Sequence, residues 1–366
     1  MPKQKLNVAM VGQGFMGRVH SNAFDQVSHF FDSPYDLQLK VICGRDRGKL
    51  ELMAAKWGWQ EIETAWQEVV SRPDIQIVDI AVPNALHAPI VLAAAKAGKI
   101  VLCEKPLAAS LQQAKNMAEA VGELPNLVWF NYRRVPAIAF AKELIADGRL
   151  GQPFHYRAVY LNQSGNDPSK TATWRYDRSQ SGSGAIGDLL SHVVDLALYL
   201  NGPIAELNAM AHTFAAARNV DDAAVILVRF ANGSIGSFEA SRYGVGCANR
   251  NTLEMNGSKG MLRFNFEEMN HLAFYDATDA PNLRGARNLM ITGPNHPYWQ
   301  NFWKPGHPIG FEHTFIAALG DFLSTLDLDL PAPNRFHPNF NDGLAVQEVL
   351  DAVERSADSR AWIRLG

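Results

Sequence analysis

Three side chains in this sequence have the types and spacing needed to oxidise an alcohol by hydride transfer. Lys105 closely follows the apolar run Ile100–Cys103, and Asp188 and His192 stand four residues apart in an apolar segment. The reaction needs a group that takes the hydroxyl proton near neutral pH, and histidine suits this because its pKa is about 6.5. It also needs a positive charge beside the oxygen, for which a lysine ammonium is suited. We predict that Lys105, Asp188 and His192 are catalytic and bind the substrate across an interdomain cleft.

Each of these residues also has a simpler explanation. A lysine at the end of a strand is most often solvated in a surface loop. Asp188 could be an acidic residue that favours the N-terminus of a helix. Asp188 and His192 could also bind a metal ion, but two ligands without an obvious third argue against this, and we predict no metal site.

A glycine-rich turn indicates which ligand these three side chains would face. The segment Gly12–Gly17 has the pattern G-x-G-x-x-G, follows the predicted strand Leu6–Val11 and opens a predicted helix over Phe15–Phe31. In this context the first glycine allows the tight turn, the second lets the backbone approach a pyrophosphate, and the third permits close packing of helix on strand. The helix N-terminus then attracts the phosphates. The predicted cofactor contacts in this turn are Gly12, Gly14, Phe15, Met16 and Gly17.

The residues after the next predicted strand, Leu37–Cys43, bear on the choice between NAD and NADP. An acidic side chain there would bind the ribose hydroxyls, whereas an arginine would favour a 2′-phosphate. The chain has Gly44, Arg45 and Asp46 at this place. Because Arg45 suits a phosphate and Asp46 is near enough to reach a ribose, the sequence leaves NAD and NADP open, with all three residues predicted to line the cofactor.

Another predicted strand, Ile75–Val82, is followed by Pro83 and Asn84. Ligands bind outside the carboxyl ends of the strands in an open α/β sheet, so Asn84 is placed to lie beside a nicotinamide. Asn84 could equally cap the helix that follows. Lys105 ends a strand in the same way, which is why we expect it to meet a ligand.

The order of the predicted elements indicates an α/β fold with an α+β second part. In the first third of the chain, strands alternate with helices, which is typical of a parallel sheet covered on both faces. After Pro136 the pattern changes, and between Glu206 and Phe266 strands follow one another across turn signals, which indicates antiparallel pairing. We predict a Rossmann dinucleotide-binding domain over residues 1–134 and an α+β substrate-binding domain with a large, mainly antiparallel sheet over residues 135–366.

Composition narrows the class of protein. The chain has 366 residues, 47% of them hydrophobic and 19% charged, with a formal net charge of -3, and no basic run is present. This argues against a nucleic-acid partner. No apolar stretch approaches the roughly 20 residues of a membrane span, and three widely separated cysteines favour a reducing compartment. We therefore expect a cytoplasmic protein without a membrane or nucleic-acid partner.

With these motifs in order, the chain resembles the Gfo/Idh/MocA family, named after glucose–fructose oxidoreductase, inositol dehydrogenase and rhizopine catabolism. The resemblance covers nearly the whole length, and its E-K-P and D-x-x-x-H motifs are more specific than the glycine turn. Besides that turn, it rests on Pro83, Asn84 and His87, on Glu104-Lys105-Pro106, on Asn131-Tyr132-Arg133-Arg134-Val135-Pro136, on Trp174-Arg175, and on Asp188, His192 and Asp195.

The resemblance implies a two-domain NAD(P)-dependent dehydrogenase acting on a polyol, a sugar or a sugar-like ring. Lys105 matches the family's catalytic lysine, which stabilises the reacting oxygen; His192 matches its acid/base, and Asp188 its substrate-binding carboxylate. A cis peptide between Lys105 and Pro106 is also implied. The further cofactor contacts that the resemblance implies are His87, Glu104, Lys105, Arg134, Trp174 and Arg175.

Within the family, the loop with Trp174-Arg175 and a late segment around His307 are similar to those of inositol, levoglucosan and other sugar-ring dehydrogenases. Trp303 and His307 are therefore implied to line the substrate pocket, the alternative being packing in a flap. Both lie in or near Asp279–Pro308, which we predict to be a long ordered loop. The resemblance also implies a homodimer or homotetramer formed through an open face of the C-terminal sheet.

Two other functions are compatible with the same fold. Some relatives cleave glycosides by transient oxidation with tightly held NAD, which would give no net reduction of the cofactor. A non-catalytic, dinucleotide-sensing regulator is the second alternative. It would be expected to lack the Lys105, Asp188 and His192 set, and all three are present.

Overall fold

The computed structural model describes residues 3–167, 173–216, 218–326 and 336–366. The chain forms two compact units, and each is described by itself. The first unit comprises Met1–Asn131 and Phe311–Ala345, and the second comprises Tyr132–Gly310 and Val346–Gly366. The predicted boundary after residue 134 lies close to the first break, whereas the return of residues 311–345 to the first unit differs from the predicted division.

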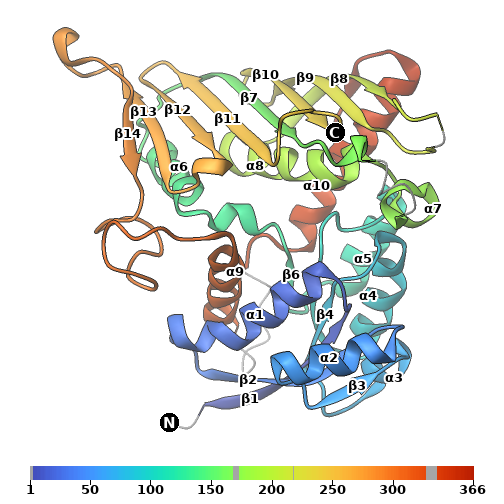
Figure 1. Ribbon diagram of the computed structural model, residues 1–366. Coiled ribbons are helices and arrows are strands. Elements are labelled where there is room, and N and C mark those ends of the chain that lie inside the picture. The colour runs from blue at the N-terminus through green and yellow to red at the C-terminus, as the bar shows by residue number, and fades with distance from the viewer. Residues whose placement is uncertain (1–2, 168–172, 217, 327–335) are drawn as a thin grey trace. The chain divides into compact units, whose positions relative to one another are not determined.

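The first unit is built on a parallel six-stranded sheet in the order β3-β2-β1-β4-β5-β6 (Figure 1). This is the Rossmann order, and it confirms the predicted fold class. The strand order reverses between β1 and β4, and ligands bind at the carboxyl ends of strands on either side of such a point. The strands are β1 (Gln4–Val11), β2 (Tyr35–Cys43), β3 (Glu61–Glu63), β4 (Ile77–Ile80), β5 (Ile100–Cys103) and β6 (Asn126–Val128).

Capping residues mark the ends of helices in the first unit. Ser110 caps α5 by accepting a hydrogen bond from the backbone N–H of Gln113, and Gly58 ends α2 in the left-handed conformation. The short elements β3 and α3 escaped prediction because a few residues carry too little periodicity. The helices are α1 (Phe15–Phe30), α2 (Arg47–Trp57), α3 (Trp66–Ser71), α4 (His87–Lys96), α5 (Leu111–Val121) and α9 (Phe311–Thr325).

Helix α9 completes the core of the first unit although it comes late in the chain. It packs along α1, and a side chain at Gly320 would overlap the ring of Phe31. Thr314 accepts a hydrogen bond of 2.8 Å from the amide of Asn131. Both helices are amphipathic, but their pairing is a tertiary fact that periodicity alone does not predict.

The second unit is built on a nine-stranded sheet in the order β14-β13-β12-β11-β7-β10-β9-β8-β15. Its neighbouring strands are antiparallel except for the parallel pair β7–β10, which confirms the mainly antiparallel sheet. The strands are β7 (Pro153–Leu161), β8 (Ile204–His212), β9 (Ala223–Phe230), β10 (Ile235–Ser241), β11 (Arg250–Gly257), β12 (Gly260–Asn265), β13 (His271–Asp276), β14 (Arg287–Met290) and β15 (Ile363–Arg364).

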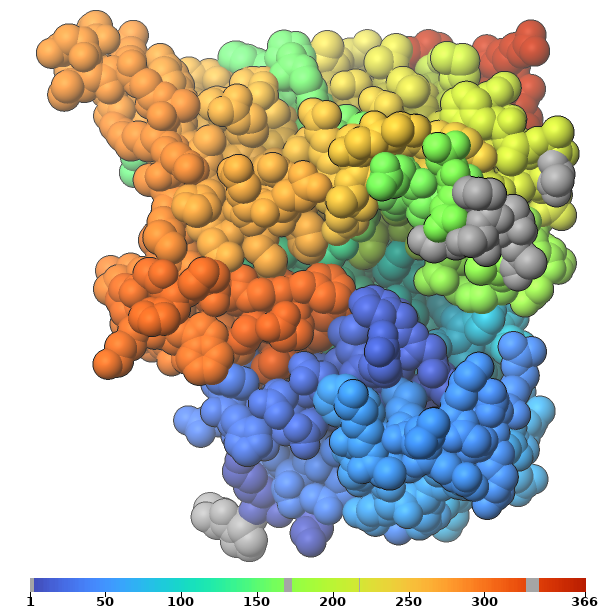
Figure 2. All heavy atoms as spheres, viewed as in Figure 1, coloured from blue at the N-terminus to red at the C-terminus, as the bar shows by residue number. Residues whose placement is uncertain are grey.

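Strand β14 lies inside Asp279–Pro308, so part of the predicted long loop is an edge strand of the sheet. The connection from β13 to β14 protrudes from this edge (Figure 2). The remainder, from residue 291 to residue 310, is made of turns and irregular backbone, as predicted.

Helices of the second unit cover one face of its sheet (Figure 1). Strand β9 shows the result, because Ile226 and Val228 are buried whereas Val225 and Leu227 on the opposite face are exposed. This alternation is the period of a sheet with one covered face. The helices are α6 (Pro136–Ala146), α7 (Arg178–Ser181), α8 (Ser191–Asn201) and the second half of α10 (Phe340–Ser359), which crosses the boundary between the units.

Among the described residues, one helical stretch, Arg178–Asn201, is long and apolar enough to cross a membrane by length and composition. Its most apolar window has a mean hydropathy of 1.2 and is 78% buried inside the protein. Core helices meet the same criterion, and the packing of α8 beneath its own sheet accounts for its apolar character.

Candidate functional site

The glycine turn after β1 has the shape that a dinucleotide pyrophosphate requires. Side chains at Gly12 and Gly17 would overlap the backbone carbonyls of Ala81 and Gly12, so the fold itself requires these two glycines. A side chain at Gly14 would meet nothing within 4 Å. The open space therefore lies at the N-terminus of α1, where amide N–H groups can bind phosphate. Phe15, 58% exposed, and the half-buried Met16 follow it.

The end of β2 contains a residue that the sequence analysis missed. The side chain of Gln13 lies against Gly44, and its oxygen accepts a hydrogen bond of 3.1 Å from the backbone N–H of Asp46. Asp46 also caps α2, and the hydrogen bond that it accepts from the backbone N–H of Lys49 lowers its pKa. Arg45 is exposed. Position 13 is one of the variable positions of the glycine pattern, so only the structure reveals its place beside the predicted ribose site.

The loop after β4 is held by a buried histidine. His87 is fully buried, with its ring nitrogens 3.1 Å from the carbonyl oxygen of Leu107 and 3.0 Å from that of Val82. Burial lowers its pKa. His87 thus ties the segment with Pro83 and Asn84 to the segment after Lys105. The N-cap positions of the 3-10 turn Asn84–Leu86 and of α4 are Pro83 and Leu86, and Asn84 is buried between them, so both roles considered for Asn84 stay predictions.

Lys105 projects from a segment whose other residues are buried. It is half-exposed, whereas Glu104 and Leu107 on either side are buried. The peptide between Lys105 and Pro106 is cis, which confirms the expectation. The backbone N–H of Lys105 donates a hydrogen bond of 3.1 Å to the carboxylate of Glu104.

The carboxylate of Glu104 belongs to a buried network centred on His20. The two ring nitrogens of His20 lie 2.8 Å from Asp79 and 3.0 Å from Glu104, and the indole N–H of Trp129 donates to Asp79 at 2.8 Å. His20 also stacks on Trp129, with ring centroids 4.3 Å apart. Complete burial would lower the pKa of His20, but the charges and hydrogen bonds of Asp79 and Glu104 outweigh it and raise the pKa to about 9.

His20 is therefore an imidazolium near neutral pH, and it donates a hydrogen bond to each carboxylate. Because His20 lies on α1, Asp79 on β4 and Glu104 directly after β5, the network fixes the cofactor-binding helix to the strand end that carries Lys105. This role of His20 was not predicted from the sequence. The only sign of it there is a histidine three residues after Gly17.

Asp188 and His192 lie on consecutive helical turns in the second unit. Their helix does not begin as a regular α-helix: Ile186–Leu190 forms a π-helical turn that contains Asp188 and runs into α8. Turns of this kind are frequent at functional sites. The Asp188 side chain is 29% exposed, and its carboxylate lies 3.1 Å from the guanidinium of Arg242 and 4.0 Å from that of Arg175.

His192 is held by aromatic rings. It stacks on Tyr132, with ring centroids 4.2 Å apart and an interplanar angle of 21°, and Tyr160 lies 5.8 Å away. The two tyrosine hydroxyls lie 3.1 Å apart, and that of Tyr160 donates to Asn249 at 2.8 Å. Burial raises the pKa of Tyr160, so its hydroxyl stays protonated. The ring of His192 therefore has a fixed plane.

A buried ion pair holds Tyr132 in place. The neighbouring Arg133 donates to both carboxylate oxygens of Asp195 at 2.7–3.1 Å, and both side chains are almost fully buried. Asp195 lies on α8, about one turn beyond His192. Two motif residues with no assigned chemistry thus join the segment that carries Tyr132 to the helix that carries His192.

The remaining predicted residues lie in the second unit. Arg134 is half-buried at the end of a 3-10 turn. The guanidinium of Arg175 lies over the ring of Trp174 at 4.6 Å. Residues 168–172, which come shortly before in the sequence, lie outside the described residues. Trp303 is 44% exposed, and a ring nitrogen of His307 lies 3.0 Å from the carbonyl oxygen of Lys304. The roles of these residues remain predictions.

The part of the chain that the structure describes contains no candidate metal site. No group of three or more His, Cys, Asp or Glu side chains there is arranged to hold an ion. The site chemistry described so far consists of a lysine, a histidine, carboxylates and arginines.

Comparisons with known proteins place the chain in a family. Residues 6–132 match the oxidoreductase family with an NAD-binding Rossmann fold, and residues 138–263 match the GFO/IDH/MocA C-terminal domain. The levoglucosan dehydrogenase of Pseudarthrobacter phenanthrenivorans is 36% identical over 98% of both chains. A solved levoglucosan dehydrogenase in complex with NADH and levoglucosan is 38% identical, with a TM-score of 0.95 over 99% of this chain and 100% of that one.

An oxidoreductase domain protein from Kribbella flavida is 43% identical, with a TM-score of 0.94 over 99% of this chain and 100% of that one. The chain belongs to the Gfo/Idh/MocA family. It is an oxidoreductase that uses a nicotinamide dinucleotide through its N-terminal Rossmann domain. The residues at the glycine turn fit this cofactor, because Gly14 leaves room for the pyrophosphate where α1 begins.

Proposed function

We propose that this member of the Gfo/Idh/MocA family is a sugar dehydrogenase that oxidises a secondary hydroxyl on a pyranose-type ring, with levoglucosan as the first candidate substrate. The observation that carries the proposal is the pair Asp188 and His192, held on consecutive helical turns by an arginine and by stacked aromatic rings. The likeness to levoglucosan dehydrogenase over 98% of both chains supports the choice of substrate.

The proposed roles follow from the chemistry of each side chain. His192 takes the proton of the reacting hydroxyl, and the stacked Tyr132 keeps its ring in one plane for that transfer. The ammonium of Lys105 stabilises the negative charge that develops on the same oxygen. Asp188 accepts hydrogen bonds from sugar hydroxyls. When bound, NAD⁺ supplies the acceptor for the hydride.

Aromatic side chains after β14 suit the apolar face of a sugar ring. We assign this role to Trp303, with His307 as a polar neighbour in the same segment. Tyr298 and Trp299 belong to the same stretch. In this proposal the segment selects the sugar, whereas Lys105 and His192 carry out the chemistry.

The open sheet face supports a homodimer or homotetramer as the functional form. Apolar side chains are exposed on three adjacent strands of this face, namely Met210 on β8, Val225 and Leu227 on β9, and Ile235 on β10. Contiguous apolar surface of this kind marks interaction sites. Light scattering coupled to size-exclusion chromatography checks the oligomer, and a monomer at micromolar concentration would contradict it.

The function is tested by following nicotinamide absorbance with levoglucosan, other anhydrosugars, aldoses and inositols, with NAD⁺ and NADP⁺ in parallel. We expect levoglucosan or a close analogue to give the highest kcat/KM. If no sugar or polyol reduces either cofactor, the proposal is wrong. Glycoside cleavage without net cofactor reduction would instead identify the NAD-dependent glycosidase.

A further inference from the structure

Arg242 is a buried cation beside the proposed substrate carboxylate. It directly follows β10, and its side chain is only 2% exposed. A buried guanidinium is costly unless its charge and its donors are satisfied. The residues that contact the guanidinium of Arg242 therefore indicate its role.

The guanidinium of Arg242 contacts two segments, the π-helical turn that contains Asp188 and the 3-10 turn Trp174–Tyr176. One guanidinium nitrogen lies 3.1 Å from the carboxylate of Asp188, and another donates to the backbone carbonyl of Arg175 at 3.3 Å. The guanidinium also lies 5.3 Å from the ring centre of Tyr176. Among the described ion pairs of Arg242, its carboxylate partner is Asp188, which is itself partly exposed.

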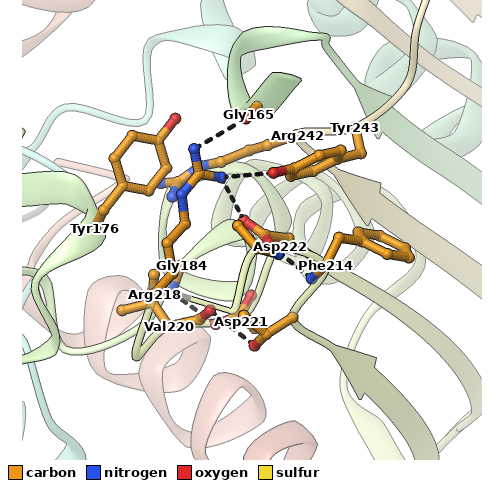
Figure 3. Close-up of polar contacts among 12 residues, drawn as sticks. Gly165, Tyr176, Gly184, Phe214, Arg218, Val220, Asp221, Asp222, Arg242 and Tyr243 are labelled. Carbon is orange, nitrogen blue, oxygen red and sulfur yellow. Dashed lines mark hydrogen bonds and ion pairs between the residues drawn. The ribbon is translucent and has the colours of Figure 1, made fainter. Parts of the chain in front are cut away.

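A second arginine in the same cluster has a different partner. Arg218 lies 3.9 Å from the ring centre of Tyr176, so one tyrosine ring serves both guanidiniums (Figure 3). Its charge is balanced by the fully buried Asp222 at 2.9 Å, and it also donates to Tyr243 and to the carbonyl of Gly165. The two arginines are therefore distinct, because Arg218 pairs within the scaffold and Arg242 pairs with Asp188.

The residue beside Asp222 fixes the other side of the same helix start. The carboxylate of Asp221 accepts hydrogen bonds from the backbone N–H groups of Gly184 at 2.6 Å and Ile186 at 2.8 Å, immediately before Asp188 (Figure 3). The backbone N–H of Arg242 donates to the carbonyl of Asp222 at 2.9 Å. Asp221 thus holds the backbone of the π-helical turn and Arg242 holds the side chain of Asp188, and the two anchoring segments are joined through Asp222.

We propose that Arg242 is a positioning residue that holds Asp188 as an oriented carboxylate for substrate hydroxyls. The inference rests on the proposed role of Asp188. Arg242 touches neither substrate nor cofactor in this proposal, and it acts through Asp188 alone. Its planar guanidinium donates along defined directions, which a lysine ammonium at the same place reproduces only in charge.

The test is a double-mutant cycle with Asp188→Asn, Arg242→Gln and the double variant, measured as kcat/KM for the best sugar. We expect Arg242→Gln to lower kcat/KM about 10- to 100-fold, mainly through KM, and to add less than about twofold in the Asp188→Asn background. Arg242→Lys should recover part of the loss, and NADH binding should change less than about twofold.

Arg218→Gln is the matched control, because it removes a neighbouring buried arginine that shares Tyr176 but pairs with Asp222. Its effect on kcat/KM should be the same in the wild-type and the Asp188→Asn backgrounds. If Arg242→Gln is also additive with Asp188→Asn, the inference is overturned while the sugar dehydrogenase proposal stands. If Asp188→Asn itself leaves kcat/KM unchanged, the proposed role of Asp188 fails and the inference fails with it. Should Arg242→Gln not fold, Arg242→Lys is put through the same cycle and decides in the same way.

Discussion

The two units hold their proposed active-site side chains by different means. In the first unit, Lys105 extends from a buried strand end whose neighbour Glu104 belongs to a fully buried network with His20 and Asp79. In the second unit, Asp188 is partly exposed on a helix start, and its carboxylate lies 3.1 Å from the guanidinium of Arg242 and 4.0 Å from that of Arg175. Strands and core positions give the first arrangement, and the π-helical turn Ile186–Leu190 gives the second.

The two arrangements should couple function and stability to different degrees. Removing His20 leaves the carboxylates of Asp79 and Glu104 in the core without their shared partner, so the protein should be less stable. Removing Arg242 leaves a carboxylate that water can reach. We therefore expect stability and catalysis to change together in the first unit and separately in the second.

The largest effects are expected at the proposed catalytic side chains themselves. Lys105→Ala and His192→Asn should each lower kcat by about 10²- to 10⁴-fold, because each removes a group that we propose acts on the reacting hydroxyl. Steady-state kinetics measures the loss, and thermal unfolding with NADH titration shows whether the fold and cofactor site remain. Near wild-type rates in both variants would remove them from the proposed mechanism.

His20→Gln tests the coupling of network and stability. The pKa of His20 rises from its usual 6.5 to about 9 on folding, so its stabilisation, on the order of 3 kcal/mol, is complete below about pH 6.5 and disappears as the pH rises through 9. Urea unfolding between pH 6 and pH 10 should show this loss in the wild type and a flatter profile in the variant.

Arg242→Gln is the counterpart of this experiment in the second unit. It should cost clearly less stability than His20→Gln at pH 7, because Asp188 can be solvated and the carboxylates around His20 cannot. Equal losses of stability in the two variants would contradict the expected difference between the units.

Gly14→Ala separates ligand binding from folding within the first unit. The open space at this position predicts an unchanged melting temperature and cofactor affinity that is weaker by about tenfold or more, since the methyl group would occupy the approach of the pyrophosphate. Gly17→Ala is the control, because it overlaps the carbonyl of Gly12 and should destabilise the protein. Fluorescence titration with NADH and thermal unfolding measure the two quantities.

The smallest effect is expected at the end of β2. Gly44→Asp would introduce a carboxylate where a ribose hydroxyl is expected, and the side chain of Gln13 that it displaces is flexible at its far end. We expect the kcat/KM ratio of NAD⁺ to NADP⁺ to rise by about tenfold. An unchanged ratio would show that position 44 does not contact the ribose.

The sequence was sufficient to predict those candidate site residues that belong to short-range patterns. The glycine turn after β1, the strand end at Lys105 and the spacing of Asp188 and His192 are all local, and each lies on the element that was predicted. The parallel sheet of the first unit was predicted from the alternation of strands and helices, whereas its strand order is known from the structure.

The groups that hold those residues were not predictable in the same way. His20, Asp79 and Glu104 are separated by up to 84 residues, and Asp188 and Arg242 by 54, so no periodicity joins them. The same limitation applies to Gln13 beside Gly44. Buried polar groups need hydrogen-bond partners, and only the three-dimensional arrangement shows which residues those partners are.

The return of α9 to the first unit sets an order of events during synthesis. A nascent chain that ends before Phe311 already contains the whole glycine turn and the whole parallel sheet, but the side of α1 that α9 covers has no partner yet. The nucleotide-binding unit is completed only after Tyr132–Gly310 of the second unit has been synthesised. A truncated chain of residues 1–134 would expose Phe31 and the Phe315 side of His20 to water, and we expect chaperone binding or aggregation in place of an independent domain.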